Sequence, residues 1–274
     1  MAESDVPSVH VDVVSDVVCP WCYIGKRRLE MAVALTPEIA VEVNWRPYFL
    51  NQWIPREGID RQTYLETKFG SPGRYAAIAE RVAAAAAIEG LPFAIDKISR
   101  QPNTLDCHRL ILWSRSATDP GEMKQRLMEL YFAEGADLSD PKTLIRAAVD
   151  CGMDGDLVRR LLASDADADR VENEANSAKE AGIDGVPCFI FGGSLIVTGA
   201  QSPEYLANAI HRIAGQQTRL RRKARQRRTV LVRALPRARS RGHVGSCAWV
   251  RIYGNRSSLR SRVISPALAA ARCW

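Results

Sequence analysis

Two cysteines separated by two residues, Cys19 and Cys22, carry the clearest chemical signal in this sequence. They follow a run rich in valine and open a segment that predicts a helix, with Pro20 at its first position. A thiol at a helix N-terminus meets unpaired backbone N–H groups and the positive end of the helix dipole, which favour the thiolate. A second thiol two residues on can then attack a mixed disulfide from within the chain. The spacing therefore predicts dithiol–disulfide exchange.

A zinc site or a purely structural role would also use paired cysteines. Zinc needs two more ligands at a similar spacing, and the sequence has no second C-x-x-C. Cys107 and His108 are adjacent, which is poor geometry for two ligands of one ion. We therefore expect no metal and favour redox chemistry, with two buried structural cysteines as the remaining interpretation.

Composition narrows the class of protein. The chain has seven cysteines, and apart from the one pair they are scattered, unlike the framework of a secreted disulfide-rich domain. The first residues are acidic and lack the basic and apolar regions of a signal peptide. No apolar run reaches the length of a membrane span. These features predict a cytoplasmic protein without membrane association.

Charge is divided unevenly along the chain. The net charge is +7, but residues 216–274 hold 16 Lys or Arg and no Asp or Glu, which leaves 22 basic against 31 acidic residues in 1–215. The basic tail has little periodicity and predicts disorder. It could bind nucleic acid electrostatically, be inert, or be a missense extension from a shifted reading frame. We expect the tail to have no role in the chemistry of the cysteines.

The elements follow from periodicity and breakers. The pattern predicts strands at 9–13 and 41–45 around a helix at 20–34, then helices from about 60 to 181, then a hairpin of strands at 188–191 and 195–198, and a last helix that begins at Ser202-Pro203 and stops at Gly215. This is an α/β, thioredoxin-like fold with an inserted all-helical domain. We assign 8–55 and 183–215 to the thioredoxin-like domain, 56–182 to the insertion and 216–274 to the tail.

Four segments together are similar to one family. Residues 16–26 (DVVCPWCYIGK) resemble the active-site segment of the DsbA-like thioredoxin family in its FrnE-type branch, and 101–109 (QPNTLDCHR) resemble a signature of that branch's insertion. Residues 185–187 and 199–201 resemble its second active-site loop and the approach to its last helix. The similarity covers about 8–213. It implies a thiol–disulfide oxidoreductase or isomerase.

The resemblance also implies roles for individual residues. Cys19 matches the attacking thiolate and Cys22 the resolving thiol. Pro187 matches a cis-proline that faces the C-x-x-C, and the backbone of Val186 would pair with an extended substrate. Pro20 and Trp21 would contribute to the substrate-binding surface around the sulfur. An ordinary trans proline at the start of a strand is the alternative for Pro187.

Four polar residues are candidates for a cleft that faces the cysteines. Asp16 could cap its loop, assist proton transfer from Cys22, or be a solvated turn carboxylate. Asn103 and Thr104 could line the cleft, although helix capping also explains Asn103. His108 could shuttle protons or be a hydrogen-bonded structural histidine.

Two further cysteines depart from the family pattern. Cys188 directly follows the expected cis-proline, and Cys107 lies inside the insertion signature. Free cysteines are commonly buried as small apolar residues, so we expect both side chains in the core and outside the redox chemistry.

Three functions remain open on the sequence alone. The first is a DsbA-family protein disulfide oxidoreductase without metal or nucleotide cofactor, reset by glutathione or a partner dithiol protein. The second is a glutathione-dependent isomerase or transferase resembling hydroxychromene-carboxylate isomerases and kappa-class glutathione transferases, which usually carry Ser at the position of Cys19 and need no resolving thiol. The third is a binding protein with a vestigial C-x-x-C or a nucleic-acid-binding tail. Cys22 favours the first.

Overall fold

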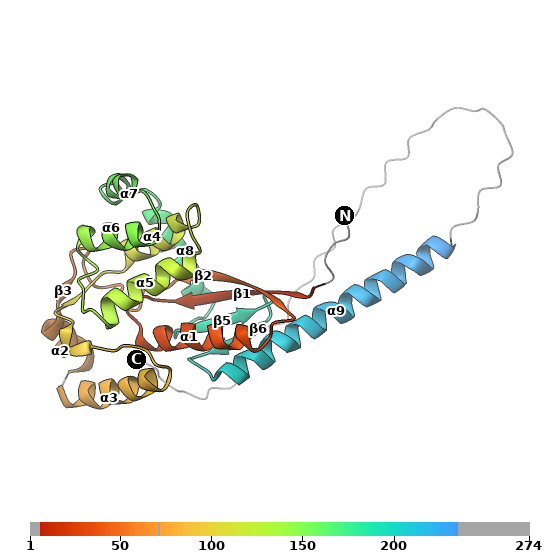
Figure 1. Ribbon diagram of the computed structural model, residues 1–274, viewed down its shortest axis with the longest axis horizontal. Coiled ribbons are helices and arrows are strands. Elements are labelled where there is room, and N and C mark those ends of the chain that lie inside the picture. Colours follow the sequence, from red (N-terminus) through yellow and green to blue (C-terminus); the bar gives the residue numbers. More distant parts are fainter. Residues whose placement is uncertain (1–5, 71, 235–274) are drawn as a thin grey trace. The chain divides into compact units, whose positions relative to one another are not determined.

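The computed structural model describes residues 6–70 and 72–234 (Figure 1). The strands are β1 (Ser8–Ser15), β2 (Ala40–Pro47), β3 (Ile59–Asp60), β4 (Arg100–Gln101), β5 (Cys188–Phe191) and β6 (Leu195–Thr198). The helices are α1 (Pro20–Ala34), α2 (Arg61–Phe69), α3 (Pro72–Ile88), α4 (Leu105–Ser114), α5 (Pro120–Phe132), α6 (Pro141–Asp150), α7 (Gly155–Leu162), α8 (Ala168–Glu180) and α9 (Pro203–Ala234). A 3-10 turn spans Ile95–Lys97.

A four-stranded sheet in the order β2-β1-β5-β6 forms the centre of the described chain. β1 and β2 are parallel and joined by α1, whereas β5 and β6 are antiparallel and form the predicted hairpin. The sheet buries Val9, Val11 and Val13 of β1 and Phe189 and Phe191 of β5. This is the predicted α/β thioredoxin-like arrangement, and it leaves β2 as an edge strand.

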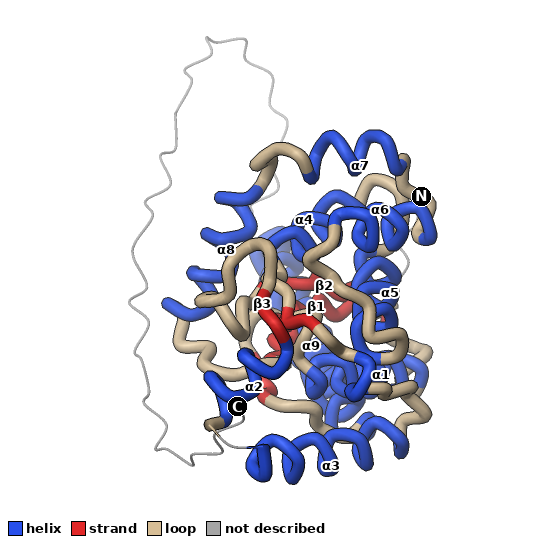
Figure 2. Tube along the Cα trace, turned by 90° about the vertical axis from the view of Figure 1, so that its left-hand side faces the viewer, coloured by secondary structure: helices blue, strands red, loops and turns tan. Residues whose placement is uncertain are grey.

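The insertion lies between β2 and β5 and is built mainly from helices. Figure 1 shows α4 to α8 gathered at one end of the sheet, and Figure 2 shows helices on all sides of the central strands. The prediction of an all-helical insertion needs one correction, because β3 and β4 pair Ile59 with Gln101 and Asp60 with Arg100. These strands are two residues long, too short to produce a period-two pattern in the sequence.

The last helix is longer than the sequence predicted. α9 passes through Gly215, the expected stop, and continues to Ala234, so the start of the basic tail is helical. Arg, Lys, Gln and Ala follow Gly215, and their helix propensity offsets the cost of about 1 kcal/mol for one glycine. The remaining tail, 235–274, lies outside the described residues.

Contacts divide the chain into two units, Met1–Arg219 and Leu220–Trp274. The sheet, the insertion and both cysteines of the pair belong to the first unit. Within the described ranges, no helix combines the length and the apolar composition needed to cross a bilayer.

A buried arginine fixes the helices of the insertion. Arg109 on α4 is fully buried and pairs with Asp106 at 2.6 Å. Its guanidinium also donates hydrogen bonds of 2.6–2.8 Å to the carbonyl oxygens of Leu161, Ser164 and Ala166. These carbonyls lie at the end of α7 and in the loop before α8, so one side chain ties three segments together.

Replacing Arg109 tests this assignment. Arg109→Met leaves three backbone carbonyls without their donor and Asp106 with Arg56 as its remaining partner, which should lower the free energy of unfolding by about 3–5 kcal/mol. Urea denaturation measures the change. The control is Arg159→Met, because Arg159 is exposed and its one ion pair within the described residues is with Asp156 on its own helix. Equal losses in both variants would contradict the buried network.

Candidate active site

Cys19 and Cys22 lie at the junction between β1 and α1. Cys19 is the N-cap residue of α1 with an extended backbone, and Pro20 occupies the first helical turn. The carbonyl of Cys19 accepts hydrogen bonds from the N–H groups of Cys22 and Tyr23 at 3.0 and 3.2 Å. The first turn contains no acidic residue. Cys19 therefore lies at the positive end of the α1 dipole.

The two thiols differ in their surroundings, although both residues are only 2% exposed. Burial raises the pKa of Cys22 well above its ordinary value, and its hydrogen bond to Cys19 raises it further. The Cys19 thiol donates to the carbonyl of Val186 at 3.6 Å. Cys22 is thus the thiol that keeps its proton.

The second active-site loop faces this pair. The Val186–Pro187 peptide bond is cis, as expected from the resemblance. Helix α1 approaches the loop closely because residue 25 is glycine. A Cβ atom at Gly25 would lie 2.8 Å from Cγ of Pro187 and 3.3 Å from the ring of Phe189. Val186 and Pro187 are therefore held beside the cysteines by direct contact with the helix that carries them.

Asp16 connects the cysteine loop to the insertion. It is fully buried, and its carboxylate accepts hydrogen bonds from the N–H groups of Val17 at 2.7 Å and Leu50 at 2.8 Å. His108 Nε2 lies 3.3 Å from the same carboxylate, and Thr104 adds a hydrogen bond. Burial alone would raise the pKa of Asp16, but these partners, His108 first, lower it overall. The structure therefore brings Asp16, Thr104 and His108 together.

Asn103 does not join this group. Its amide donates to the carbonyl of Ile54 at 2.7 Å, and its oxygen accepts from the N–H of Leu105 at 2.9 Å at the start of α4. The capping interpretation of Asn103 is the one that the geometry shows. Trp21 packs partly buried against Val82 and Ala86 of α3, and Pro20 is half-exposed beside it.

A buried lysine lies behind the cysteines, and the sequence analysis missed it. Lys124 on α5 is 1% exposed, and its ammonium group lies 5.3 Å from the ring centre of Trp45. Within the described chain no hydrogen bond or ion pair to its amine is found. Burial lowers the pKa of Lys124 to about 8, opposed by the nearby Cys22 and Asp16. The sequence did contain a sign of this burial, because position 124 falls on the apolar face of α5 that is formed by positions 123, 127, 128 and 131.

Lys68 is a second group near Cys19 that the sequence analysis missed. The amine of Lys68 on α2 donates to the side-chain oxygen of Asn51 at 2.5 Å. Burial lowers the pKa of Lys68, and Cys19 is the first of the groups that oppose this shift. The amide nitrogen of Asn51 is buried and has no hydrogen-bond partner in the part of the chain that the structure describes. Lys68 and Asn51 thus form a hydrogen-bonded pair whose cation is close enough to Cys19 to interact with it electrostatically.

The other described cysteines stay outside this site. Cys107 and Cys188 are buried in the core, as predicted. Burial raises the pKa of both thiols, that of Cys188 to about 11. Among the residues with described side chains, no three His, Cys, Asp or Glu form a cluster that could hold a metal ion.

The cost of burying Lys124 can be measured. Lys124→Met keeps the volume and removes the charge, so it should stabilise the protein by about 1–3 kcal/mol at pH 7. The unfolded chain holds the Lys124 proton up to an ordinary pKa of 10.5, while the folded chain releases it near 8. As the pH rises between these two values, the free energy of unfolding of the wild type should therefore increase relative to that of the variant.

Urea denaturation of both proteins at pH 7 and pH 10 tests this expectation, with Lys142→Met, an exposed lysine on α6, as control. A stability difference that grows between pH 7 and pH 10 would contradict the assignment.

Known proteins share this architecture. The model of the family described as DSBA-like thioredoxin domain matches residues 10–211. A curated relative, the uncharacterized protein YwbO of Bacillus subtilis, is 26% identical over 205 residues, which are 74% of this chain and 96% of YwbO.

Two solved structures extend the comparison. The probable DsbA oxidoreductase SCO1869 of Streptomyces coelicolor is 31% identical with a TM-score of 0.69, covering 76% of this chain and 90% of that one. The cytosolic disulfide reductase DsbM of Pseudomonas aeruginosa, solved with GSH, shares the fold at 15% identity and a TM-score of 0.52, over 77% of this chain and 99% of DsbM. The family model covers well over half of the sequence, and the chain belongs to the DsbA-like thioredoxin family.

Proposed function

We propose that this protein is a thiol–disulfide oxidoreductase that uses Cys19 as nucleophile and Cys22 as resolving thiol. The observation that carries the proposal is the pairing of an N-cap cysteine with a second, buried thiol under the cis Val186–Pro187 loop. The Cys19 thiolate attacks a substrate disulfide, and one substrate sulfur leaves as a thiolate. Cys22 then loses its proton and attacks Cys19. The second substrate sulfur leaves, and the Cys19–Cys22 disulfide remains.

The buried charges support the second half of this cycle. A thiol with a raised pKa needs help to become a nucleophile. The Lys124 cation opposes the rise in the pKa of Cys22, and the backbone N–H of Asp16 does the same. We assign Lys124 the role of stabilising the Cys22 thiolate as it forms, and Asp16 with His108 the role of fixing the loop that carries both cysteines.

The substrate's backbone would bind at the second loop. Val186 precedes the cis-proline, and its carbonyl already meets the Cys19 sulfur. An extended substrate would replace that contact with backbone hydrogen bonds to Val186, while Pro20 and Trp21 contact its side chains. No metal or nucleotide enters this cycle.

Glutathione fits as the co-substrate that resets the pair. Lys68 supplies a cation that interacts electrostatically with Cys19, and its partner Asn51 supplies an amide nitrogen without a hydrogen-bond partner among the described residues. Such donors bind carboxylates. The fold shared with DsbM, which was solved with GSH, is compatible with this assignment. We expect these two side chains to hold a glutathione carboxylate.

Cysteine variants test the two-thiol mechanism. Cys22→Ser should accumulate a covalent mixed disulfide through Cys19, visible by mass spectrometry, and insulin reduction should fall at least about 100-fold. Cys19→Ser should neither trap substrate nor turn over. Cys151→Ser, on a thiol outside the site, should behave as wild type. Undiminished turnover by Cys22→Ser would favour the glutathione-dependent isomerase or transferase instead.

Lys68 tests the glutathione assignment. Lys68→Met should raise the KM for glutathione about three- to tenfold and leave kcat nearly unchanged, because the lost contact acts in binding. Steady-state reduction of a small disulfide measures both constants, with Lys142→Met as control. A fall in kcat at constant KM would contradict a binding role.

A further inference from the structure

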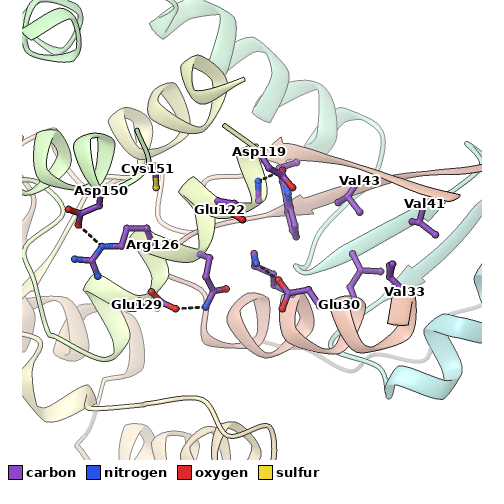
Figure 3. A pocket seen from close by; sticks show the side chains of 15 residues that line it. Glu30, Val33, Val41, Val43, Asp119, Glu122, Arg126, Glu129, Asp150 and Cys151 are labelled. Carbon is purple, nitrogen blue, oxygen red and sulfur yellow. Dashed lines mark hydrogen bonds and ion pairs between the residues drawn. The ribbon is translucent and has the colours of Figure 1, made fainter. Parts of the chain in front are cut away.

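A groove runs along α1 on the C-terminal side of the cysteine pair. It encloses about 630 Å³ between α1, β2 and α5, with Asp150 and Cys151 at one end (Figure 3). Neither Cys19 nor Cys22 lines it. Cavities of about 300–1,000 Å³ are typical of ligand sites.

One end of the groove is apolar. Figure 3 shows Val33 of α1 and Val41 and Val43 of β2 together at this end. β2 is the edge strand of the sheet, so no further strand in the described chain covers its outer side. All three valines are only partly buried. A partner with an apolar face could remove them from water, which is favourable at roughly 25 cal/mol per Å².

The rest of the groove is acidic. Its two basic residues are already paired: Lys26 with Glu30, and Arg126 with Asp150 and Glu134. Three acidic residues of the lining, Asp119, Glu122 and Glu129, have no cation partner among the described side chains. The groove therefore has an excess of negative charge beside its apolar end.

The two glutamates are regularly spaced. Glu122 and Glu129 are seven residues apart on α5, about two helical turns or roughly 10.5 Å along one face. Two basic residues seven apart on a second helix have the same separation. A helix whose apolar face lies against the valines could thus pair with both glutamates at once.

We propose that this groove docks a basic amphipathic helix of a partner protein. Its apolar side chains cover Val33, Val41 and Val43, and two Lys or Arg residues seven positions apart pair with Glu122 and Glu129. Helix-in-groove binding of this kind uses an apolar face for affinity and flanking charges for orientation. The site is independent of the thiol cycle, because its residues do not include the cysteine pair.

A labelled peptide tests the proposal on the full chain. The probe is a fluorescein-labelled 18-residue helix of Leu and Lys with lysines seven apart, and its counterpart carries Glu in place of Lys. Fluorescence anisotropy should show binding of the Lys peptide only. Cys19→Ser/Cys22→Ser should bind it as wild type does, which separates this site from the redox function.

Matched variants locate the binding. Glu122→Gln/Glu129→Gln should weaken binding about fivefold or more, since two ion pairs are lost. Glu80→Gln/Glu180→Gln removes the same charge from exposed positions on α3 and α8 and should change binding less than twofold. Val43→Thr, which keeps size and strand preference, should also weaken binding. Circular dichroism checks that each variant is folded.

Four results would overturn the proposal. They are the absence of binding by the Lys peptide, equal losses in the two glutamine double variants, unchanged binding by Val43→Thr, and self-association of the protein that disappears in Glu122→Gln/Glu129→Gln. The second result would mean that the Lys peptide binds through attraction to the overall negative charge of the protein rather than to the groove. The last means that a second copy of this chain occupies the groove. Sedimentation velocity over a range of concentrations measures self-association.

Discussion

The buried carboxylate of Asp16 is the interaction on which the site depends. It lies in the loop between β1 and α1, three residues before Cys19, and it bonds at once to that loop, to the loop after β2 and to α4 of the insertion. A buried carboxylate is costly unless every oxygen has partners. The chain meets this demand only when the thioredoxin-like part and the insertion are joined correctly, so the same contacts that satisfy Asp16 also position the cysteine loop.

A second constraint is the balance of charge behind the cysteines. Cys22, Lys124 and Asp16 are all buried, so each changes the protonation of the others more strongly than it would in water. A lysine without a hydrogen-bond partner lowers stability, and a protein keeps such a group at a functional site more readily than elsewhere. The insertion therefore contributes an electrostatic component to the redox centre in addition to its shape.

Most of the fold could be predicted from the sequence, because its local signals agree. Pro20 marks the start of α1, alternating valines mark β1, and Gly192-Gly193 marks the hairpin. The residues of the candidate site were harder to predict than the fold. Cys19, Cys22 and Pro187 stand in recognisable motifs. The placement of Lys68 near Cys19 depends on the packing of α2, which no sequence motif predicts. Lys124 looked like an ordinary charged residue on a helix. Gly215 was misleading, since a single glycine does not outweigh the helix-forming residues after it.

The burial of Cys188 has a consequence for how the protein withstands oxidants. With a pKa of about 11, this thiol is ionised in about one molecule in ten thousand at pH 7. Peroxides and disulfides react with thiolates, so Cys188 stays unreacted although it directly follows the proline of the active-site loop. Susceptibility to oxidants therefore follows the environment of each sulfur rather than its distance from Cys19 and Cys22, so the core can hold a further thiol beside the active-site loop without disulfide scrambling.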